Sequence, residues 1–161
     1  MFALKIVGTV CITGATTLYA RGLVNELSCR IAALKAIKQS FTTLKGELRY
    51  GVETLPSAFM HVGERCSCGQ ETVRDFFWNT GNRLKTENGS ILKEVWEEEA
   101  KKLAAAACLN GNECDNLIAV ADSLGYLDLT QQTNNIELYL QSVDESIEAL
   151  SGKYEQNSRM Y

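Results

Sequence analysis

Six cysteines and one histidine are the residues of this 161-residue chain that could form a thiolate–imidazole zinc site or a Cys-His catalytic pair. Cys66 and Cys68 have one residue between them, whereas paired cysteines of zinc sites commonly have two to four, and Cys108 and Cys114 have five. A Ser-His-Asp or Cys-His arrangement could be built only on His61, and no nucleophile-elbow motif accompanies it. We therefore expect free thiols, no metal site, no cofactor and no catalytic residue. An enzyme that uses the Cys66 and Cys68 thiols is the alternative.

The stretch LGYLDLTQQ, residues 124–132, also contains side chains that could form a small binding or catalytic loop. Gly125 follows the last apolar residue of one periodic run, where a left-handed helix cap favours glycine. Asp128 precedes the next run and Gln131 lies three residues further on, which is the spacing of a capping box. The pattern predicts a joint between two helices, in which these side chains cap helix ends and bind no substrate.

Charge is distributed unevenly around a net charge of -4, which argues against a nucleic-acid-binding protein. Residues 104–151 contain acidic side chains but no Lys or Arg, and residues 21–49 are mainly basic. An acidic run of this kind is either a solvated face or a surface that orients a basic partner. For the second case the candidate partner-binding residues are Glu137, Asp144 and Glu148.

The elements that must position these residues are helices. The chain has 45% hydrophobic residues and a single proline, which fits one helical domain with a core. Apolar residues recur in steps of three and four in two long runs. The first run is Leu23, Leu27, Ile31, Leu34, Ile37, Phe41, Leu44 and Leu48, and the second is Ile136, Leu140, Val143, Ile147, Leu150 and Tyr154.

Four shorter helices are expected between the two long runs. They are predicted at Leu55–Arg65, with Pro56 in the first turn, at Glu71–Leu84, after an N-cap at Ser90, and around Leu117–Leu124. The expected fold is therefore all-α, an antiparallel bundle of about six helices. Lys38 and Lys45 lie beside the apolar stripe of the first long helix, and Glu137 and Asp144 lie beside that of the last. These opposite charges predict that the two long helices are neighbours.

The amino-terminal 20 residues are predicted to anchor the chain in a membrane, and residues 21–161 to form the helical bundle domain. The uncharged stretch Ile6–Ala20 would span roughly 22 Å as a helix. Counting Phe2 to Leu4, with the Lys5 side chain reaching to the headgroups, extends it to about 28 Å. A cleaved signal peptide and a buried core helix are the alternatives. If the segment is an anchor, the basic residues after it place the body in the cytoplasm, where free thiols are expected.

Four motifs occur in an order that resembles the stage III sporulation protein AB family: ELRYGVETLPSAF (47–59), NGSILKEVW (88–96), LGYLDLTQQ (124–132) and NSRMY (157–161). The resemblance implies an N-terminal membrane segment followed by a helical domain similar to the cytoplasmic domains of the type II secretion F family. It also assigns Gly125, Asp128 and Gln132 to an interhelical joint. In that family a second hydrophobic segment usually follows the position of Tyr161.

The same resemblance implies a function without catalysis. It points to a membrane-anchored platform component of the channel between mother cell and forespore, with its body facing the mother-cell cytoplasm. The implied partners are the other stage III sporulation channel proteins and the associated secretion-type ATPase. A soluble or secreted helical regulatory or interaction module is the alternative from a different class.

Overall fold

The computed structural model describes the backbone of residues 2–50, 54–67, 69–87, 89, 91–125 and 128–159, and the side chains of these residues except 2–21, 23, 24 and 157–159. Six α-helices and no strand occur in these ranges, which confirms the all-α prediction. Their bounds are α1 Phe2–Tyr50, α2 Leu55–Glu64, α3 Glu71–Thr86, α4 Leu92–Ala106, α5 Gly111–Leu124 and α6 Leu129–Arg159.

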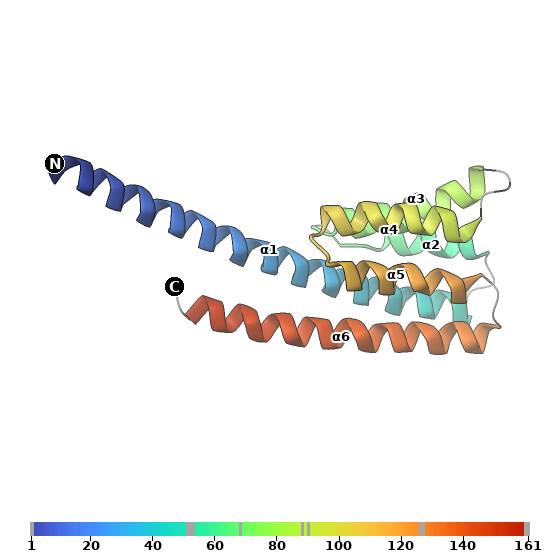
Figure 1. Ribbon diagram of the computed structural model, residues 1–161. Helices are drawn as coiled ribbons and strands as arrows, with labels where there is room; N and C mark the ends of the chain where they lie inside the picture. Colours follow the sequence, from blue (N-terminus) through green and yellow to red (C-terminus); the bar gives the residue numbers. More distant parts are fainter. Residues whose placement is uncertain are drawn as a thin grey trace.

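The helices form an antiparallel bundle around the carboxyl-terminal half of α1. Along the chain α2 packs on α3, α3 on α4, α4 on α5 and α5 on α6, while α1 contacts α2, α3 and α6. The two long helices α1 and α6 run side by side in opposite directions, and the N-terminal part of α1 extends past the bundle (Figure 1). The start of α1 and the end of α6 therefore lie on the same side of the bundle (Figure 1).

The predicted boundary after Ala20 falls inside a helix, because α1 is continuous from Phe2 to Tyr50. The side chains of residues 1–21 lie outside the described residues, so the anchor at residues 1–20 stays a prediction. Across the parts of the chain that the structure describes, no helix combines the length and apolar character needed to cross a lipid bilayer.

The core is built by the two stripes that the sequence pattern indicates. On α1 the buried stripe includes Leu34, Ile37, Phe41 and Leu44, and on α6 it includes Ile136, Val143 and Leu150. A cluster of five aromatic rings fills the space between α1, α2, α3 and α4, with ring centroids 4.8–6.3 Å apart: Phe41, Phe59, Phe76, Phe77 and Trp96. Burial of this apolar surface is the main favourable term in the stability of the bundle.

Close packing of α2 on α3 depends on Gly81. A Cβ atom at this position would lie 2.5 Å from the carbonyl oxygen of Pro56 and 2.7 Å from Cγ of Met60. Real Cβ atoms do not approach backbone oxygens so closely, so any larger residue would push the two helices apart. Gly81 is accordingly buried in the α2–α3 contact.

Two ion pairs confirm that α1 and α6 are neighbours in the predicted alignment. Lys38 Nζ lies 2.6 Å from Oδ1 of Asp144, and the ammonium group of Lys45 contacts the carboxylate of Glu137. Both pairs are at the surface, where a pair contributes roughly 0.2–1 kcal/mol. They therefore favour one alignment of the two helices more than they stabilise the fold.

One residue of the acidic run after Trp96, Glu99, is buried instead of facing solvent. Its side chain is only 3% exposed and accepts hydrogen bonds from Arg83 (3.1 Å) and Lys102 (2.7 Å). Glu99 follows Trp96 by three residues, so both side chains lie on the buried face of α4. Two cationic partners compensate the cost of burying the carboxylate.

The helices α2 and α3 begin at Leu55 and Glu71, the residues predicted to start them. The first long helix ends at Tyr50, and Pro56 lies in the first turn of α2. At the start of α4 the N-cap residue is Ile91, which contributes no side-chain cap, and the predicted N-cap Ser90 lies outside the described residues.

Candidate interaction surface

The joint between α5 and α6 is held by two side-chain hydrogen bonds. Oδ1 of Asp128 accepts a hydrogen bond from the backbone N–H of Gln131 at 2.9 Å, which is the contact expected of an N-cap. The side-chain amide of Gln132 donates to the carbonyl oxygen of Leu124 at 2.8 Å and so connects the start of α6 with the end of α5. In both contacts a side chain satisfies a backbone group at a helix end. It stays a prediction that Asp128 and Gln132 serve only to join the two helices.

The left-handed cap predicted at Gly125 is wrong. Gly125 has φ -88° and ψ -25°, which is right-handed backbone that any residue adopts. A left-handed cap is one way to satisfy the last carbonyl groups of a helix. Here the side-chain amide of Gln132, on the next helix, donates a hydrogen bond to the carbonyl oxygen of Leu124 instead. A left-handed residue instead occurs after α4, at Cys108, whose φ is 55°.

We expect Asp128→Ala to lower the free energy of unfolding by about 1 kcal/mol, because one backbone donor of α6 loses its cap. Asp128→Asn keeps an oxygen that can accept the same hydrogen bond and is the matched control. Thermal or urea unfolding of both variants measures the difference. An unchanged Asp128→Ala midpoint together with loss of partner binding would instead show that Asp128 contacts a partner.

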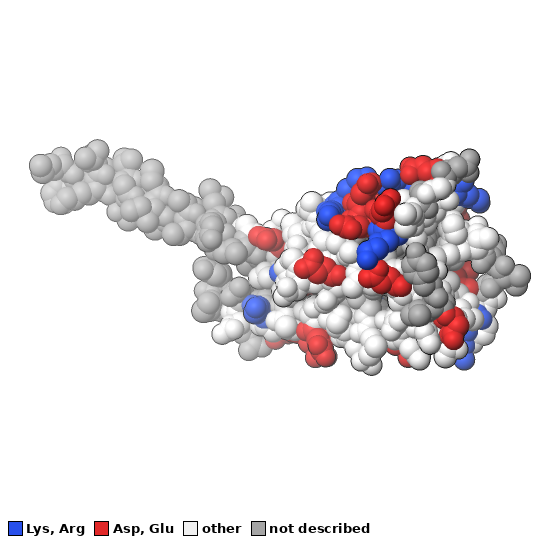
Figure 2. Space-filling view, turned by 45° about the vertical axis from the view of Figure 1, so that its right-hand side comes forward, with Lys and Arg blue, Asp and Glu red and all other residues white. Residues whose placement is uncertain are grey.

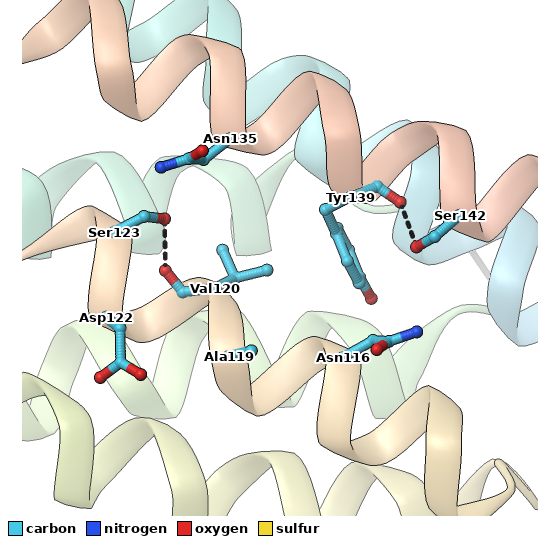
Figure 3. Close-up of a pocket in the computed structure, with 8 residues that line it drawn as sticks. All are labelled: Asn116, Ala119, Val120, Asp122, Ser123, Asn135, Tyr139 and Ser142. Carbon is cyan, nitrogen blue, oxygen red and sulfur yellow. Dashed lines mark hydrogen bonds between the residues drawn. The ribbon is translucent and has the colours of Figure 1, made fainter.

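An open groove of about 460 Å³ runs between α5 and α6, next to this joint (Figure 3). On the α6 side Asn135, Tyr139 and Ser142 line it at spacings of four and three residues, so they share one helix face. On the α5 side the lining residues are Asn116, Ala119, Val120, Asp122 and Ser123. The groove is thus lined by both polar and apolar side chains, between two helices whose main apolar faces are turned to the core.

The side chains of the groove can form hydrogen bonds but are not arranged for acid–base or nucleophilic chemistry. The Ser123 and Ser142 hydroxyls donate to carbonyl oxygens of their own helices, Val120 at 2.7 Å and Tyr139 at 2.8 Å. Asp122 points away from α6 (Figure 3) and pairs with Lys93 of α4 at 2.8 Å. The two amides, Asn116 and Asn135, each offer hydrogen-bond donors and an acceptor in the lining of the groove.

Tyr139 forms the floor of the groove. Its ring reaches from α6 toward Asn116 of α5 (Figure 3) and is 8% exposed. Burial, together with the negative charge of Glu113 and then Cys114, raises the pKa of Tyr139 far above its ordinary value. The phenol is therefore uncharged at every physiological pH and offers a neutral hydroxyl.

The acidic residues proposed for partner binding are mostly paired inside the protein. Glu137 and Asp144 form the ion pairs with α1, so reversing either charge would also disturb the α1–α6 contact. Glu148 is exposed and has no ion pair among the described residues. In Figure 2 acidic and basic side chains lie next to each other over the upper part of the bundle, and further acidic and basic ones are scattered over the rest of this face.

Glu113, which the sequence pattern places in the acidic surface, is buried. Both its carboxylate oxygens accept hydrogen bonds from the guanidinium group of Arg30 on α1, at 2.8–3.1 Å. The same carboxylate accepts the backbone N–H of Asn110, whose side-chain oxygen accepts the N–H of Glu113. Glu113 thus closes the capping box at the start of α5 and, through Arg30, also connects α5 with α1.

The thiols and His61 that the structure describes form no cluster that could hold a metal ion. No group of three or more His, Cys, Asp or Glu residues among those described is placed to hold an ion. Cys66 hydrogen-bonds with the Ser40 hydroxyl at 3.4 Å and with the Val62 carbonyl at 3.5 Å, while Cys68 lies outside the described residues.

The groove residues were missed in the sequence because none of them carries a distinctive motif. The signal that could have identified them is spacing: polar side chains at Asn116 and Ser123, and at Asn135 and Ser142, recur seven residues apart beside apolar core positions. That spacing predicts a polar stripe on each helix, but only the packing of α5 on α6 shows that the stripes face one another.

Comparison with known proteins gives one consistent result. The family model of stage III sporulation protein AB matches residues 5–161. The stage III sporulation protein AB of Bacillus subtilis (strain 168) is 24% identical over 143 residues, which cover 89% of this chain and 81% of the relative. A solved structure of a stage III sporulation protein AB is similar with a TM-score of 0.69 and 20% identity, and the similarity covers 79% of this chain and 97% of that structure.

Proposed function

The chain belongs to the stage III sporulation protein AB family and has a role in sporulation, and we propose that this role is non-catalytic. In this proposal the protein is a membrane-anchored platform component of the channel between mother cell and forespore. It lies in the membrane of the sporulating cell, with its body in the mother-cell cytoplasm, and works beside the other stage III sporulation channel proteins and a secretion-type ATPase.

The arrangement of the chain ends supports a platform at a membrane. The N-terminal part of α1 extends away from the bundle, and α6 ends on the same side (Figure 1). A membrane that held residues 1–20 would therefore lie on that side, and the opposite end of the bundle, which contains the α5–α6 joint, would point into the cytoplasm. Release of the bundle from the membrane fraction when residues 1–20 are deleted is the corresponding test, and full-length protein in the supernatant without detergent would contradict the anchor.

The groove between α5 and α6 is the observation that supports partner docking best. It presents the Asn116 and Asn135 amides and the neutral Tyr139 hydroxyl on rigid helices, and these groups suit a polar helix or extended segment of another protein. We assign the docking of the secretion-type ATPase, or of a neighbouring platform protein, to this groove.

The test uses two neighbouring asparagines of α6. Asn135→Arg inserts a long cation into the groove, whereas Asn134→Arg adds the same charge at an exposed position that does not line it. We expect Asn135→Arg to weaken binding of the purified ATPase by tenfold or more, roughly 1.4 kcal/mol, and Asn134→Arg to leave it unchanged. Titration of the bundle with each partner in turn measures this. Equal affinities of the two variants for every partner would exclude the groove as the docking surface.

An acidic contribution to docking is tested separately at Glu148. Because Glu137 and Asp144 bind lysines of α1, Glu148→Lys is the charge reversal that leaves those ion pairs intact. If the acidic surface orients a basic partner, this variant slows association and the effect decreases as salt is added. Binding that depends on neither salt nor Glu148→Lys would contradict an electrostatic role.

A further inference from the structure

Cys29 and Cys108 bring two thiols together from distant parts of the chain. Cys29 lies on α1 and Cys108 in the turn between α4 and α5, and both side chains are exposed. Cys29 is near enough to Cys108 to raise the pKa of the Cys108 thiol, through its charge and through a hydrogen bond. Cys29 also lines a cavity of about 180 Å³ together with Ala106 and Ala107, the residues just before Cys108.

The contact between these two segments is fixed by the groups next to the cysteines. Arg30, which follows Cys29, holds the Glu113 carboxylate through three hydrogen bonds, and Glu113 closes the capping box at the start of α5. The α4–α5 turn is therefore bound to α1 within a few residues of each thiol. A disulfide requires this kind of preset approach, because Cα atoms more than about 7 Å apart cannot be bridged without backbone movement.

Cys108 occupies a position that favours glycine. Its φ of 55° is left-handed, and the N–H of Leu109 donates to the carbonyl of Ala104 at 3.0 Å, which is the long bond of a Schellman motif. A side chain with a Cβ pays a conformational cost in this backbone region. A non-glycine residue kept in this conformation points to a role for its side chain, and the Cys108 thiol lies near Cys29.

We propose that Cys29 and Cys108 form a disulfide bond when the protein meets an oxidant of the peroxide class, and that this bond locks the point at which α1 leaves the bundle. The Cys29 sulfur attacks one oxygen of hydrogen peroxide, the O–O bond breaks, and a sulfenic acid and one water form. The Cys108 sulfur then attacks the Cys29 sulfur and displaces the second water. Two thiols lose two electrons and two protons in total, and one peroxide is reduced to two waters.

The roles of the two thiols follow from their surroundings. Desolvation by the surrounding protein, and then the nearby Cys29 and the Glu26 carboxylate, raise the pKa of the Cys108 thiol. Since the thiolate is the attacking form, the raised pKa makes Cys108 the poorer nucleophile toward peroxide, and we assign the first step to the exposed Cys29. Among the described cysteines the other two have different neighbours: Cys66 bonds to Ser40, and the Cys114 thiol is perturbed by Asp115, Lys101 and Glu97.

A bridge at this place would act on the bundle as a whole. It closes a loop of about 80 residues, from α1 to the end of α4, and thus restricts the unfolded chain strongly. It also joins α1 to the α4–α5 turn where α1 begins to extend past the bundle (Figure 1). The orientation of the N-terminal part of α1 relative to the bundle would then respond to oxidation.

The experiment oxidises the full-length chain, purified in mild detergent, with a small excess of hydrogen peroxide and compares it with the reduced chain. Trypsin leaves Cys108 and Cys114 in one peptide, so a second protease that cleaves after Glu113 is needed to separate them. We expect a linked peptide pair containing Cys29 and Cys108 in mass spectrometry, and a rise in the thermal midpoint of about 5–15 °C that a dithiol reductant reverses.

Three variants decide the assignment. Cys29→Ser should abolish both the linked peptides and the peroxide-dependent rise, and Cys114→Ser should change neither. Cys108→Gly should remove the link as well, yet raise the midpoint of the reduced chain by about 2–4 °C because glycine relieves the left-handed strain. A rise that persists in Cys29→Ser, a bridge between another pair, or peroxide products that stop at sulfinic acid on unlinked Cys29 would overturn the proposal.

Discussion

Trp96→Ala is expected to lower the free energy of unfolding by about 3–5 kcal/mol, which is a large part of the stability of a domain of this size. Trp96 is fully buried, and its ring contacts the rings of Phe41 on α1, Phe59 on α2 and Phe76 on α3 at centroid distances of 4.8–6.1 Å. Its removal leaves a cavity bordered by several helices at once, and such a cavity closes only partly. Urea unfolding followed by circular dichroism measures the loss.

The matched control separates the volume of Trp96 from its polar group. The indole N–H donates to the carbonyl oxygen of Leu117 on α5 at 2.8 Å, so Trp96 also ties α4 to α5. Trp96→Phe keeps most of the ring packing and loses this hydrogen bond, for which we expect a cost of about 1–2 kcal/mol. If Trp96→Ala and Trp96→Phe were equally destabilised, loss of the hydrogen bond would account for the whole destabilisation. The cavity argument would then be wrong.

Periodicity was sufficient to predict the helices, because a buried stripe depends only on local spacing. The residues at Leu34, Phe41 and Ile136 are buried as their positions in the two long runs indicate. The pairing of α1 with α6 could also be predicted, since lysines beside one stripe and acids beside the other are complementary only if the helices are neighbours. The ion pair between Lys38 and Asp144 shows that alignment directly.

The buried carboxylates could not be predicted, because a glutamate is compatible with a helix surface wherever it occurs. Glu99 and Glu113 are enclosed only because Arg83 and Arg30 come to them from other helices, 16 and 83 residues away in the chain. Local pattern carries no information about such partners. The same holds for Trp78, which follows two buried phenylalanines on α3 and is 40% exposed.

The candidate site shows the same division between local and tertiary information. Asp128 and Gln131 could be identified from their spacing, because an N-cap is formed within four residues. The bond from Gln132 to Leu124 spans the joint, and it replaces the cap that was expected at Gly125. The groove itself arises from the way two polar stripes are brought face to face, which no single helix determines.

Arg30→Met is expected to destabilise the protein by about 3 kcal/mol, although Arg30 lies at the edge of the bundle. Methionine keeps much of the apolar length of the side chain but removes three hydrogen bonds to Glu113, whose side chain is only 7% exposed. A carboxylate left buried without its cation keeps the full cost of desolvation, and breaking such pairs costs about 3–5 kcal/mol. We expect a cost at the lower end of this range because the Arg30 side chain is 19% exposed, so the ion pair is partly hydrated.

The double variant shows that the buried charge, and not the lost side chain, causes this destabilisation. Glu113→Gln removes the charge while its amide can still take part in the capping box with Asn110. Combined with Arg30→Met it should therefore recover stability, so that the double variant is less destabilised than the sum of the two single variants by at least 1 kcal/mol in urea unfolding. Additive effects would show that Arg30 stabilises the α1–α5 contact by packing alone, and the capping box would then be independent of α1.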